Sequence, residues 1–309
     1  MASESPVTRH VPVLADEVLH WLDPQPGQRI VDGTLGGGGH ARLLAQRVGN
    51  SGRVIALDRD PGTIERGRVN LQGLPVELVQ ANFCDLPEML LELEVSEVDG
   101  VLLDLGLSSD QLADPDRGFS FDSAGPLDMR FDPDRGEPAW RLVNKLSERR
   151  LADLIYQYGE ERHSRRIARR IVEARRVEPI RSARRLAGLV RESVPRARKG
   201  VLSRSERRRR EPIDPATRTF QALRIAVNDE IGSLERALQR IPDCLRIGGR
   251  LAVISFHSLE DRPVKTALRD DPRLRVLTRR PVRPTEAEIE ANPRSRSARL
   301  RVAERVDST

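Results

Sequence analysis

The feature that most constrains the fold of this chain is a glycine cluster that lies between an apolar run and a helical pattern. Residues 29–40 read RIVDGTLGGGGH, in which the short apolar run ends at Asp32. The order of strand, glycine turn and helix is typical of a nucleotide-binding βαβ unit. A second apolar run at 54–57 ends at Asp58, where such a unit places a carboxylate on a ribose diol. The stretch therefore predicts a ligand that contains a nucleoside.

Charge indicates which nucleoside this unit binds. A dinucleotide would place its pyrophosphate over the glycines and the helix N-terminus, where Asp32 would repel it. The P-loop pattern, counted from Gly33, requires a lysine where Gly39 stands. S-adenosylmethionine carries no phosphate but has an ammonium group, a sulfonium and a ribose diol, and glycines let the backbone approach it closely. We therefore predict S-adenosylmethionine as the cofactor, with Asp32 and Asp58 as binding residues; a merely flexible glycine turn is the alternative.

The charge balance points to a nucleic-acid partner. The chain has 309 residues and a formal net charge of +6, and its only lysines are Lys145, Lys199 and Lys265. Arginine forks pair with phosphate and stack on bases, so the excess of arginine favours binding to RNA or DNA. A compositional bias towards arginine would explain the scarcity of lysine but not the positive balance.

The cysteines and the apolar runs argue for a cytoplasmic protein without a metal centre. Cys84 and Cys244 are the only cysteines, and no CxxC pattern occurs. We therefore expect neither a disulfide framework nor a metal cluster. There is no run of 18 apolar residues, and residues 1–9 lack the apolar core of a signal peptide. We expect no association with a membrane.

Strands and helices alternate in the first part of the chain and return near its end. Strands that alternate with helices of this length form a parallel sheet, so the predicted fold class is α/β. The apolar run at 98–107 is too continuous for a half-exposed strand and predicts a buried one. The expected strands are 29–31, 53–57, 76–79, 98–107, 251–256, 273–278 and 298–303, and the expected helices are 10–22, 40–48, 61–71, one long helix at 217–245 and one from Ser258.

The middle of the chain has a different texture. Residues 110–138 are rich in Asp, Pro, Gly and Arg and predict a long loop that acts as a lid or a binding surface. Helical spacing follows at 146–158, 167–177 and 183–194 without strands between them. The basic run at 196–211 predicts an RNA-binding arm or a mobile loop, with a solvated charge run as the alternative.

Two further residues follow predicted strands at the edge where a ligand would bind. Phe83 comes after the third strand, beside the expected adenine pocket, where it would either stack on the base or anchor the core. Asp104 ends the buried fourth strand and would face the site of group transfer. Both residues are therefore candidates for the binding site.

Nine motifs resemble those of one known family. The chain is similar to the bacterial 16S ribosomal RNA cytosine-N4 methyltransferases, the H family of small-subunit methyltransferases, over Arg9 to about Arg305. The resemblance implies methyl transfer from S-adenosylmethionine to the exocyclic N4 of one cytidine in the decoding region. It also implies a Rossmann-like class I methyltransferase sheet with an inserted all-helical domain, which we place at 113–214 between methyltransferase segments 1–112 and 215–309. The motifs are HVPVLADEV, DGTLGGGGH, ALDRDP, LDLGLSSDQL, RGFSF, GPLDMRFD, TRTFQALRIAVNDE, SFHSLEDR and NPRSRSARLR.

The family pattern also implies which residues contact the cofactor. Most of them agree with the positions reached from chemistry, but His40 and Gln111 follow from the resemblance alone. For His40 the alternative is a helix cap, and we expect its backbone N–H to make the contact. The chain departs from the pattern at Pro263, which a first helical turn tolerates. The implied cofactor contacts are Gly38, Gly39, His40, Asp58, Phe83, Asp104 and Gln111.

The chemistry of cytosine N4 suggests a catalytic arrangement. The lone pair of this amine is delocalised into the ring, and many amino-methyltransferases restore it with a (D/N)PP(Y/F) tetrapeptide. Here the corresponding residues, 104–107, read DLGL. Our hypothesis is that Asp104 or a neighbouring carbonyl accepts an N4 hydrogen while Ser255, His257 and Ser258 position the base. His257 would otherwise serve as a general base or as a structural histidine.

The expected partner is 16S ribosomal RNA, either with the cytidine flipped out or within an open, partly assembled small subunit. Phosphate contacts from the basic insertion predict a steep dependence of binding on salt. A homodimer is left open. Other classes also stay open: a methyltransferase of a small molecule, a DNA amino-methyltransferase, and a non-catalytic RNA-binding assembly factor.

Overall fold

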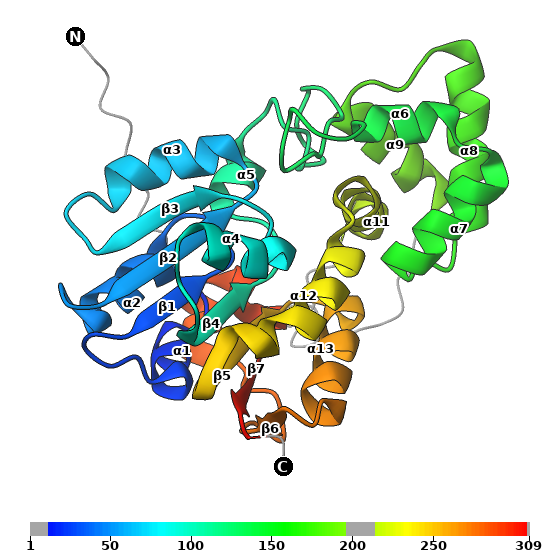
Figure 1. Cartoon of the computed structure of the whole chain (residues 1–309). Coiled ribbons are helices and arrows are strands. Elements are labelled where there is room, and N and C mark those ends of the chain that lie inside the picture. The colour runs from blue at the N-terminus through cyan, green and yellow to red at the C-terminus, as the bar shows by residue number, and fades with distance from the viewer. Residues whose placement is uncertain (1–11, 196–213, 308–309) are drawn as a thin grey trace, which may run out of the picture. The chain divides into compact units, whose positions relative to one another are not determined.

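The computed structural model describes residues 12–195 and 214–307 (Figure 1). Its sheet has seven strands in the order β3-β2-β1-β4-β5-β7-β6. The first five strands are parallel, and β7 runs antiparallel to both β5 and β6. This arrangement confirms the predicted α/β, Rossmann-like sheet. The strands are β1 (Arg29–Asp32), β2 (Arg53–Asp58), β3 (Val76–Gln80), β4 (Val98–Asp104), β5 (Leu245–Ser255), β6 (Leu274–Val276) and β7 (Arg299–Arg305).

Contacts divide the chain into two compact units, residues 1–109 with 231–309 and residues 110–230. The first unit contains the sheet, and the second has helices only among its described elements. The helices that belong wholly or mainly to the sheet unit are α1 (Ala15–Leu22), α2 (Gly39–Val48), α3 (Pro61–Asn70), α4 (Leu86–Glu92), α12 (Glu230–Cys244), α13 (Ser258–Asp270) and α14 (Glu286–Ala291), with short 3-10 helices at Phe83–Asp85 and Pro293–Ser297. Those of the second unit are α5 (Ser109–Ala113), α6 (Ala139–Lys145), α7 (Glu148–Gly159), α8 (Ser164–Val177), α9 (Ala183–Ser193) and α11 (Ala216–Asn228).

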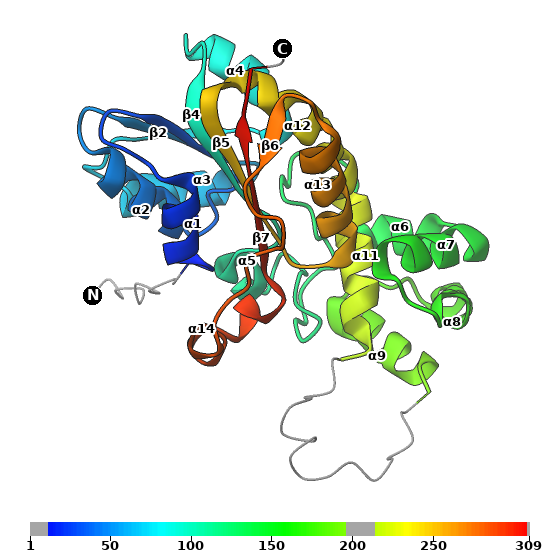
Figure 2. The same ribbon diagram turned by 90° about the horizontal axis from the view of Figure 1, so that it is seen from below.

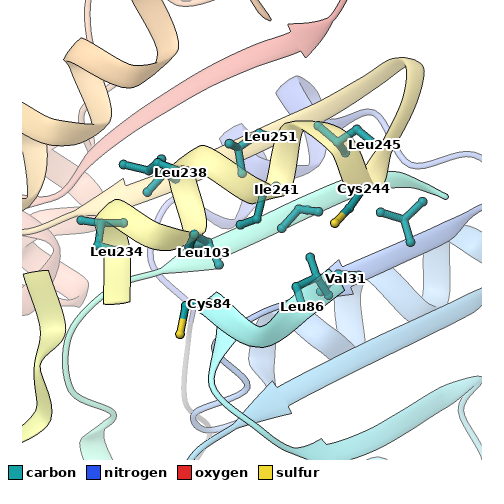
Figure 3. Packing of buried hydrophobic residues seen from close by; sticks show 14 of the residues in the cluster. Val31, Cys84, Leu86, Leu103, Leu234, Leu238, Ile241, Cys244, Leu245 and Leu251 are labelled. Atoms are coloured by element: carbon teal, nitrogen blue, oxygen red, sulfur yellow. The ribbon is translucent and has the colours of Figure 1, made fainter. Parts of the chain in front are cut away.

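The sheet is buried on both faces, which explains its continuous apolar strands. Neighbouring residues of one strand point to opposite faces, so Leu102 and Leu103 enter different clusters. Helices α4, α12 and α13 cover the face that includes Leu103, and α1, α2 and α3 cover the other (Figure 2). Figure 3 shows Leu234, Leu238 and Ile241 of α12 packed over the first of these faces. The three layers hold the carboxyl ends of the strands in fixed positions.

The strand register brings three acidic residues to one edge of the sheet. Asp32 of β1 pairs with Ala56 of β2 and with Leu102 of β4. Asp58 and Asp104 therefore both lie two residues beyond the level of Asp32, on the strands that flank β1. The chain order of the strands reverses beside β1, and ligands of open α/β sheets bind at the carboxyl edge near such a point.

The boundary of the helical unit differs from the one expected from the sequence. We placed the return to the methyltransferase segment at residue 215, whereas α11 groups with the helical unit and the return comes at residue 231. Gly159 of α7 explains the close approach of α11, because a Cβ at this position would lie 2.5 Å from the carbonyl oxygen of Arg218. The packing of α7 on α11 thus belongs to the helical unit itself.

The single long helix predicted over residues 217–245 is wrong. Asp229 adopts a left-handed conformation, with φ of 49°, and separates α11 from α12. The break is stabilised on both sides, since Arg224 forms two hydrogen bonds to Glu230 of 2.7 and 2.9 Å and Asn228 donates to the carbonyl of Arg224. The amphipathic pattern continues across the break, so periodicity alone did not reveal it.

Residues 114–138 form the predicted long loop, and hydrogen bonds hold it within the helical unit. The side-chain amide of Asn228 accepts from the N–H of Phe131 at 2.7 Å and donates to the carbonyl of Met129 at 2.7 Å. Arg117 donates to the carbonyls of Arg130 and Phe131. Leu127 and Met129 are buried. The loop is therefore a fixed part of its unit, and its role as a lid or binding surface stays a prediction.

Three other expectations concern membrane association, the cysteines and the basic run. Within the described ranges, no helix is both long enough and apolar enough to cross a membrane. Cys84 and Cys244 are free thiols and are buried. The basic run predicted at 196–211 lies outside the described residues.

Candidate functional site

The glycine cluster forms a tight turn between β1 and α2. Gly36 and Gly38 have φ values of 49° and 77°, which side-chain-bearing residues rarely adopt. A Cβ at Gly33 would lie 2.5 Å from a methyl group of Leu103, and one at Gly39 would lie 3.1 Å from Pro12. The glycines are therefore required by the turn and by close packing, and they leave bare backbone at the carboxyl edge of the sheet.

Asp58 ties this turn to the end of β2. Its carboxylate accepts hydrogen bonds from the N–H of Gly36 at 3.0 Å and from the N–H of Asp60 at 2.9 Å. Burial raises the pKa of Asp58 to about 6, although both hydrogen bonds oppose the shift. Asp58 thus fixes the shape of the glycine turn and still has lone pairs available for a ligand hydroxyl.

Asp32 is fully buried at the end of β1. One carboxyl oxygen accepts from the N–H of Thr34 at 3.1 Å, and the other, Oδ2, has no hydrogen-bond partner among the residues that the structure describes. Burial raises the pKa of Asp32 to about 7, and the charge of Asp58 adds to the shift. A buried oxygen without a partner is costly, so this position fits a ligand that donates hydrogen bonds or carries positive charge.

Asp104 lies at the end of β4 and contacts the first turn of α2. His40 Nε2 is 3.6 Å from Asp104 Oδ2, and the Asp104 N–H donates to the hydroxyl of Thr34 at 2.7 Å. Burial raises the pKa of Asp104 well above its ordinary value, and the charges of Asp32 and Glu260 add to this effect. The side chain of His40 is therefore part of the acidic cluster, and the cofactor contact expected from its backbone N–H stays a prediction.

The turn from β5 to α13 carries the predicted residues Ser255, His257 and Ser258. Ser255 is buried at the end of the strand. Glu260 organises the turn, because it accepts from the N–H groups of Phe256 at 2.7 Å and of His257 at 3.3 Å, and its other oxygen lies 3.0 Å from His257 Nε2. Glu260 thereby fixes the backbone of the turn, lies beside the imidazole and acts electrostatically on Asp104.

Glu260 is the residue of this cluster that sequence reasoning missed. The available signal was a glutamate three residues after the helix cap, which forms a capping box. The following residue, Asp261, has a structural role, since it accepts from Arg301 at 2.7 Å and from Arg299 at 2.9 Å and so joins α13 to β7. These contacts give structural roles to the two acidic residues of the SFHSLEDR segment and to the two arginines of the SARLR segment.

Two predicted residues are less closely tied to this cluster. Phe83 follows β3 and is partly buried against the core. A Cβ added at Gly33 would lie 3.1 Å from the Cβ of Phe83. Phe83 thus borders the glycine turn, and stacking on a base stays a prediction. Gln111 is buried and belongs to the helical unit. Within residues 12–195 and 214–307, no group of three His, Cys, Asp or Glu side chains is arranged to hold a metal ion.

The fold and this site define a class of protein. A Rossmann-like sheet carries a glycine turn without a phosphate-binding lysine, and buried and half-buried carboxyl groups line its carboxyl edge. Such a site suits a cationic nucleoside and would repel a polyphosphate. These are the features of a class I S-adenosylmethionine-dependent methyltransferase.

Comparison with known proteins gives the family. The model of the MraW methylase family matches residues 7–306. The chain is 49% identical over 316 residues to the ribosomal RNA small subunit methyltransferase H of Rhodopirellula baltica, covering 99% of this chain and 94% of that protein. It is 50% identical over 302 residues to the protein of the same name from Deinococcus radiodurans, covering 97% and 91%. The chain therefore belongs to the MraW methylase family, which confirms the resemblance found in its motifs.

The raised pKa of Asp32 predicts how stability depends on pH. A carboxyl group whose pKa is raised by folding takes up a proton, so its contribution to stability is complete below pH 3.8 and is lost as the pH rises to about 7. We expect Asp32→Asn to gain stability relative to the wild type as the pH rises from 5 to 7, by up to about 1.4 kcal/mol per pH unit. Urea unfolding at each pH measures this difference.

The control for this measurement is Asp270→Asn, because Asp270 is exposed and pairs with Arg269. The pKa of Asp270 is lowered by its hydrogen bond to Arg269, so this variant should not gain stability as the pH rises. A constant difference between Asp32→Asn and the wild type from pH 5 to 8 would contradict the raised pKa.

Proposed function

We propose that this chain transfers a methyl group from S-adenosylmethionine to the exocyclic N4 of a cytidine in the decoding region of small-subunit ribosomal RNA. The observation that carries the proposal is the acidic cluster beside the glycine turn, in which Asp32 is buried and Asp58 and Asp104 are half-buried. The substrate follows from relatives that are named ribosomal RNA small subunit methyltransferase H. The choice of N4 rests on the motif resemblance.

The cofactor would lie along the carboxyl edge of β1 and β2. Asp58 would accept the ribose hydroxyls, and the free oxygen of Asp32 would face the positive end of the molecule. The backbone of Gly38, Gly39 and His40 and the side chain of Phe83 would complete the pocket, and the contact with Gln111 stays a prediction from the motif resemblance. When bound, S-adenosylmethionine supplies an electrophilic methyl group activated by the sulfonium.

Asp104 is suited to hold the amine that is methylated. Its Oδ1 has no hydrogen-bond partner among the described residues. We propose that this oxygen accepts an N4–H, which draws electron density back to the nitrogen, and then takes the proton that the methylated amine loses. A nearby positive charge would lower the raised pKa of Asp104 and favour the carboxylate that this role requires.

Ser255, His257 and Ser258 would position the cytosine from the end of β5. Glu260 accepts from two backbone N–H groups of this turn and lies 3.0 Å from His257 Nε2, so the backbone that carries the imidazole is held in place. We propose a positioning role for His257, whose two ring nitrogens make no hydrogen bond to the residues that the structure describes and can contact the base. In-line placement of the amine would supply most of the acceleration.

The positioning role of His257 predicts a specific kinetic result. We expect His257→Ala to slow single-turnover methylation by about tenfold to a hundredfold while the shape of the pH–rate profile is kept. Loss of one limb of the profile would instead show that His257 is the general base. An unchanged rate and an unchanged profile would leave His257 with a structural role only.

The carboxylates predict how cofactor affinity depends on pH and on substitution. Protonation removes the negative charge of Asp32 and Asp58, whose pKa values are raised to about 7 and 6, so affinity for S-adenosylmethionine should fall as the pH drops from 7 to 5. We expect Asp58→Asn to weaken binding by about tenfold to a hundredfold, the worth of a charged hydrogen bond. Calorimetry of the wild type between pH 5 and pH 8 measures the pH dependence, and at pH 8 it compares the wild type with Asp58→Asn.

Glu65→Gln is the matched control for the calorimetry, because Glu65 is an exposed acid of α3 that pairs with Arg68. Its removal should leave cofactor affinity unchanged. Equal affinities of the wild type and of variants at both Asp32 and Asp58 would refute the proposed cofactor site.

The substrate is tested by mapping modified nucleosides in the ribosomal RNA of cells that lack this gene. We expect one cytidine of the decoding region to lose its N4-methyl group and to regain it when the gene is restored, but not with an Asp104→Ala variant. Methylation of small molecules or of duplex DNA without RNA methylation would favour another substrate class. The small-subunit particle, the homodimer and the cytoplasmic location stay predictions.

A further inference from the structure

Helix α8 of the helical unit is unusually rich in arginine. This helix, labelled in Figure 1, has the sequence SRRIARRIVEARRV, which holds six arginines and a single glutamate. The exposed side chains recur at intervals of three and four residues and so form one stripe along the helix. The buried side is apolar and includes Ile167 and Ile171. We call the exposed set the α8 arginine face: Arg162, which precedes the helix, Arg165, Arg166, Arg169, Arg170 and Arg176.

Few carboxylates neutralise this face. Arg169 lies 3.6 Å from Glu148, and Arg170 lies 3.0 Å from Glu192. Arg165, Arg166 and Arg176 have no carboxylate within 4.0 Å among the residues that the structure describes. The face therefore presents a surplus of positive charge to solvent.

Arg175 of the same helix shows what a structural arginine looks like in this unit. Its guanidinium turns inward and donates to the carbonyls of Val143 and Leu146, both at 2.6 Å. Burial lowers the pKa of Arg175. The arginines of the exposed face donate to no carbonyl in the part of the chain that the structure describes, so packing there does not account for their number.

The arrangement is unfavourable for the free protein. Arg165 and Arg169, like Arg166 and Arg170, are four residues apart, and like charges at this spacing destabilise a helix. Arg165 and Arg166 also lie in the first turn, which has no acidic residue, and the positive end of the helix dipole disfavours cations there. A surface that served only solubility would mix both signs of charge. An anionic partner would remove the repulsion.

We infer that the α8 arginine face binds the phosphate backbone of the RNA substrate. Arginine forks match phosphate oxygens, and the face runs about 16 Å from Arg165 to Arg176, so several phosphates can contact it. No aromatic residue lies on α8, so the face supplies affinity and orientation and leaves recognition of the cytidine to the sheet unit. This inference rests on the proposed function and names the surface that holds its substrate.

The test replaces three arginines of the face together, in Arg165→Gln, Arg166→Gln and Arg169→Gln, and measures binding to a small-subunit ribosomal RNA fragment at several salt concentrations. We expect the affinity to fall by about tenfold or more and the slope of log K against log salt to decrease by roughly 0.7 to 0.9 for each lost contact. Thermal stability should stay equal or rise, because the repulsion is relieved, and S-adenosylmethionine should bind as in the wild type.

The matched control removes the same charge from the sheet unit, in Arg47→Gln, Arg68→Gln and Arg269→Gln. These exposed arginines lie in the last turns of α2, α3 and α13, and helices of a parallel sheet end at the edge opposite the site. Equal salt slopes in the two triple variants would overturn the inference. The inference would also fail if the α8 triple variant kept its RNA binding and instead lost binding to anionic lipid vesicles. Failure of the wild type to bind or methylate the RNA would instead refute the proposed function.

Discussion

The crowding of three partly or fully buried carboxyl groups at the ends of adjacent parallel strands is the constraint on which the rest of the site depends. Asp32, Asp58 and Asp104 lie at one edge because the register of β1 with β2 and β4 leaves no other position for them. Their removal from water raises all three pKa values, and their mutual repulsion adds to the cost. A cationic nucleoside would relieve this cost, so the same burial that destabilises the free protein would provide cofactor affinity.

The surrounding elements hold these groups in place. The glycine turn hydrogen-bonds to Asp58, Thr34 contacts both Asp32 and Asp104, and Glu260 fixes the turn that carries His257. Apolar layers on both faces of the sheet keep water from the strands. The helical unit adds a different electrostatic element, because its α8 arginine face is positive, whereas the candidate site of the sheet unit is acidic. Acidic groups would thus hold the cofactor, and basic groups would hold the RNA.

Local sequence patterns predicted the elements whose signals are themselves local. The parallel strands, the glycine turn and the acidic strand ends follow from short-range alternation and from the chemistry of a few residues, and the structure contains them. The break at Asp229 was missed, because the apolar period continues from α11 into α12 and only the backbone conformation interrupts it. The limit of the helical unit was missed for a related reason, since it depends on α11 packing against α7.

The sequence by itself determined the fold class, the family, the cofactor type and the acidic strand ends, because each depends on residue types at fixed spacings along the chain. Tertiary structure decided which side chains meet. His40 and Asp104 are 64 positions apart, and Glu260 acts on Asp104 from a different part of the chain. Such contacts arise only when strand order and burial bring distant segments together, and the raised pKa values follow from that burial and not from the residues alone.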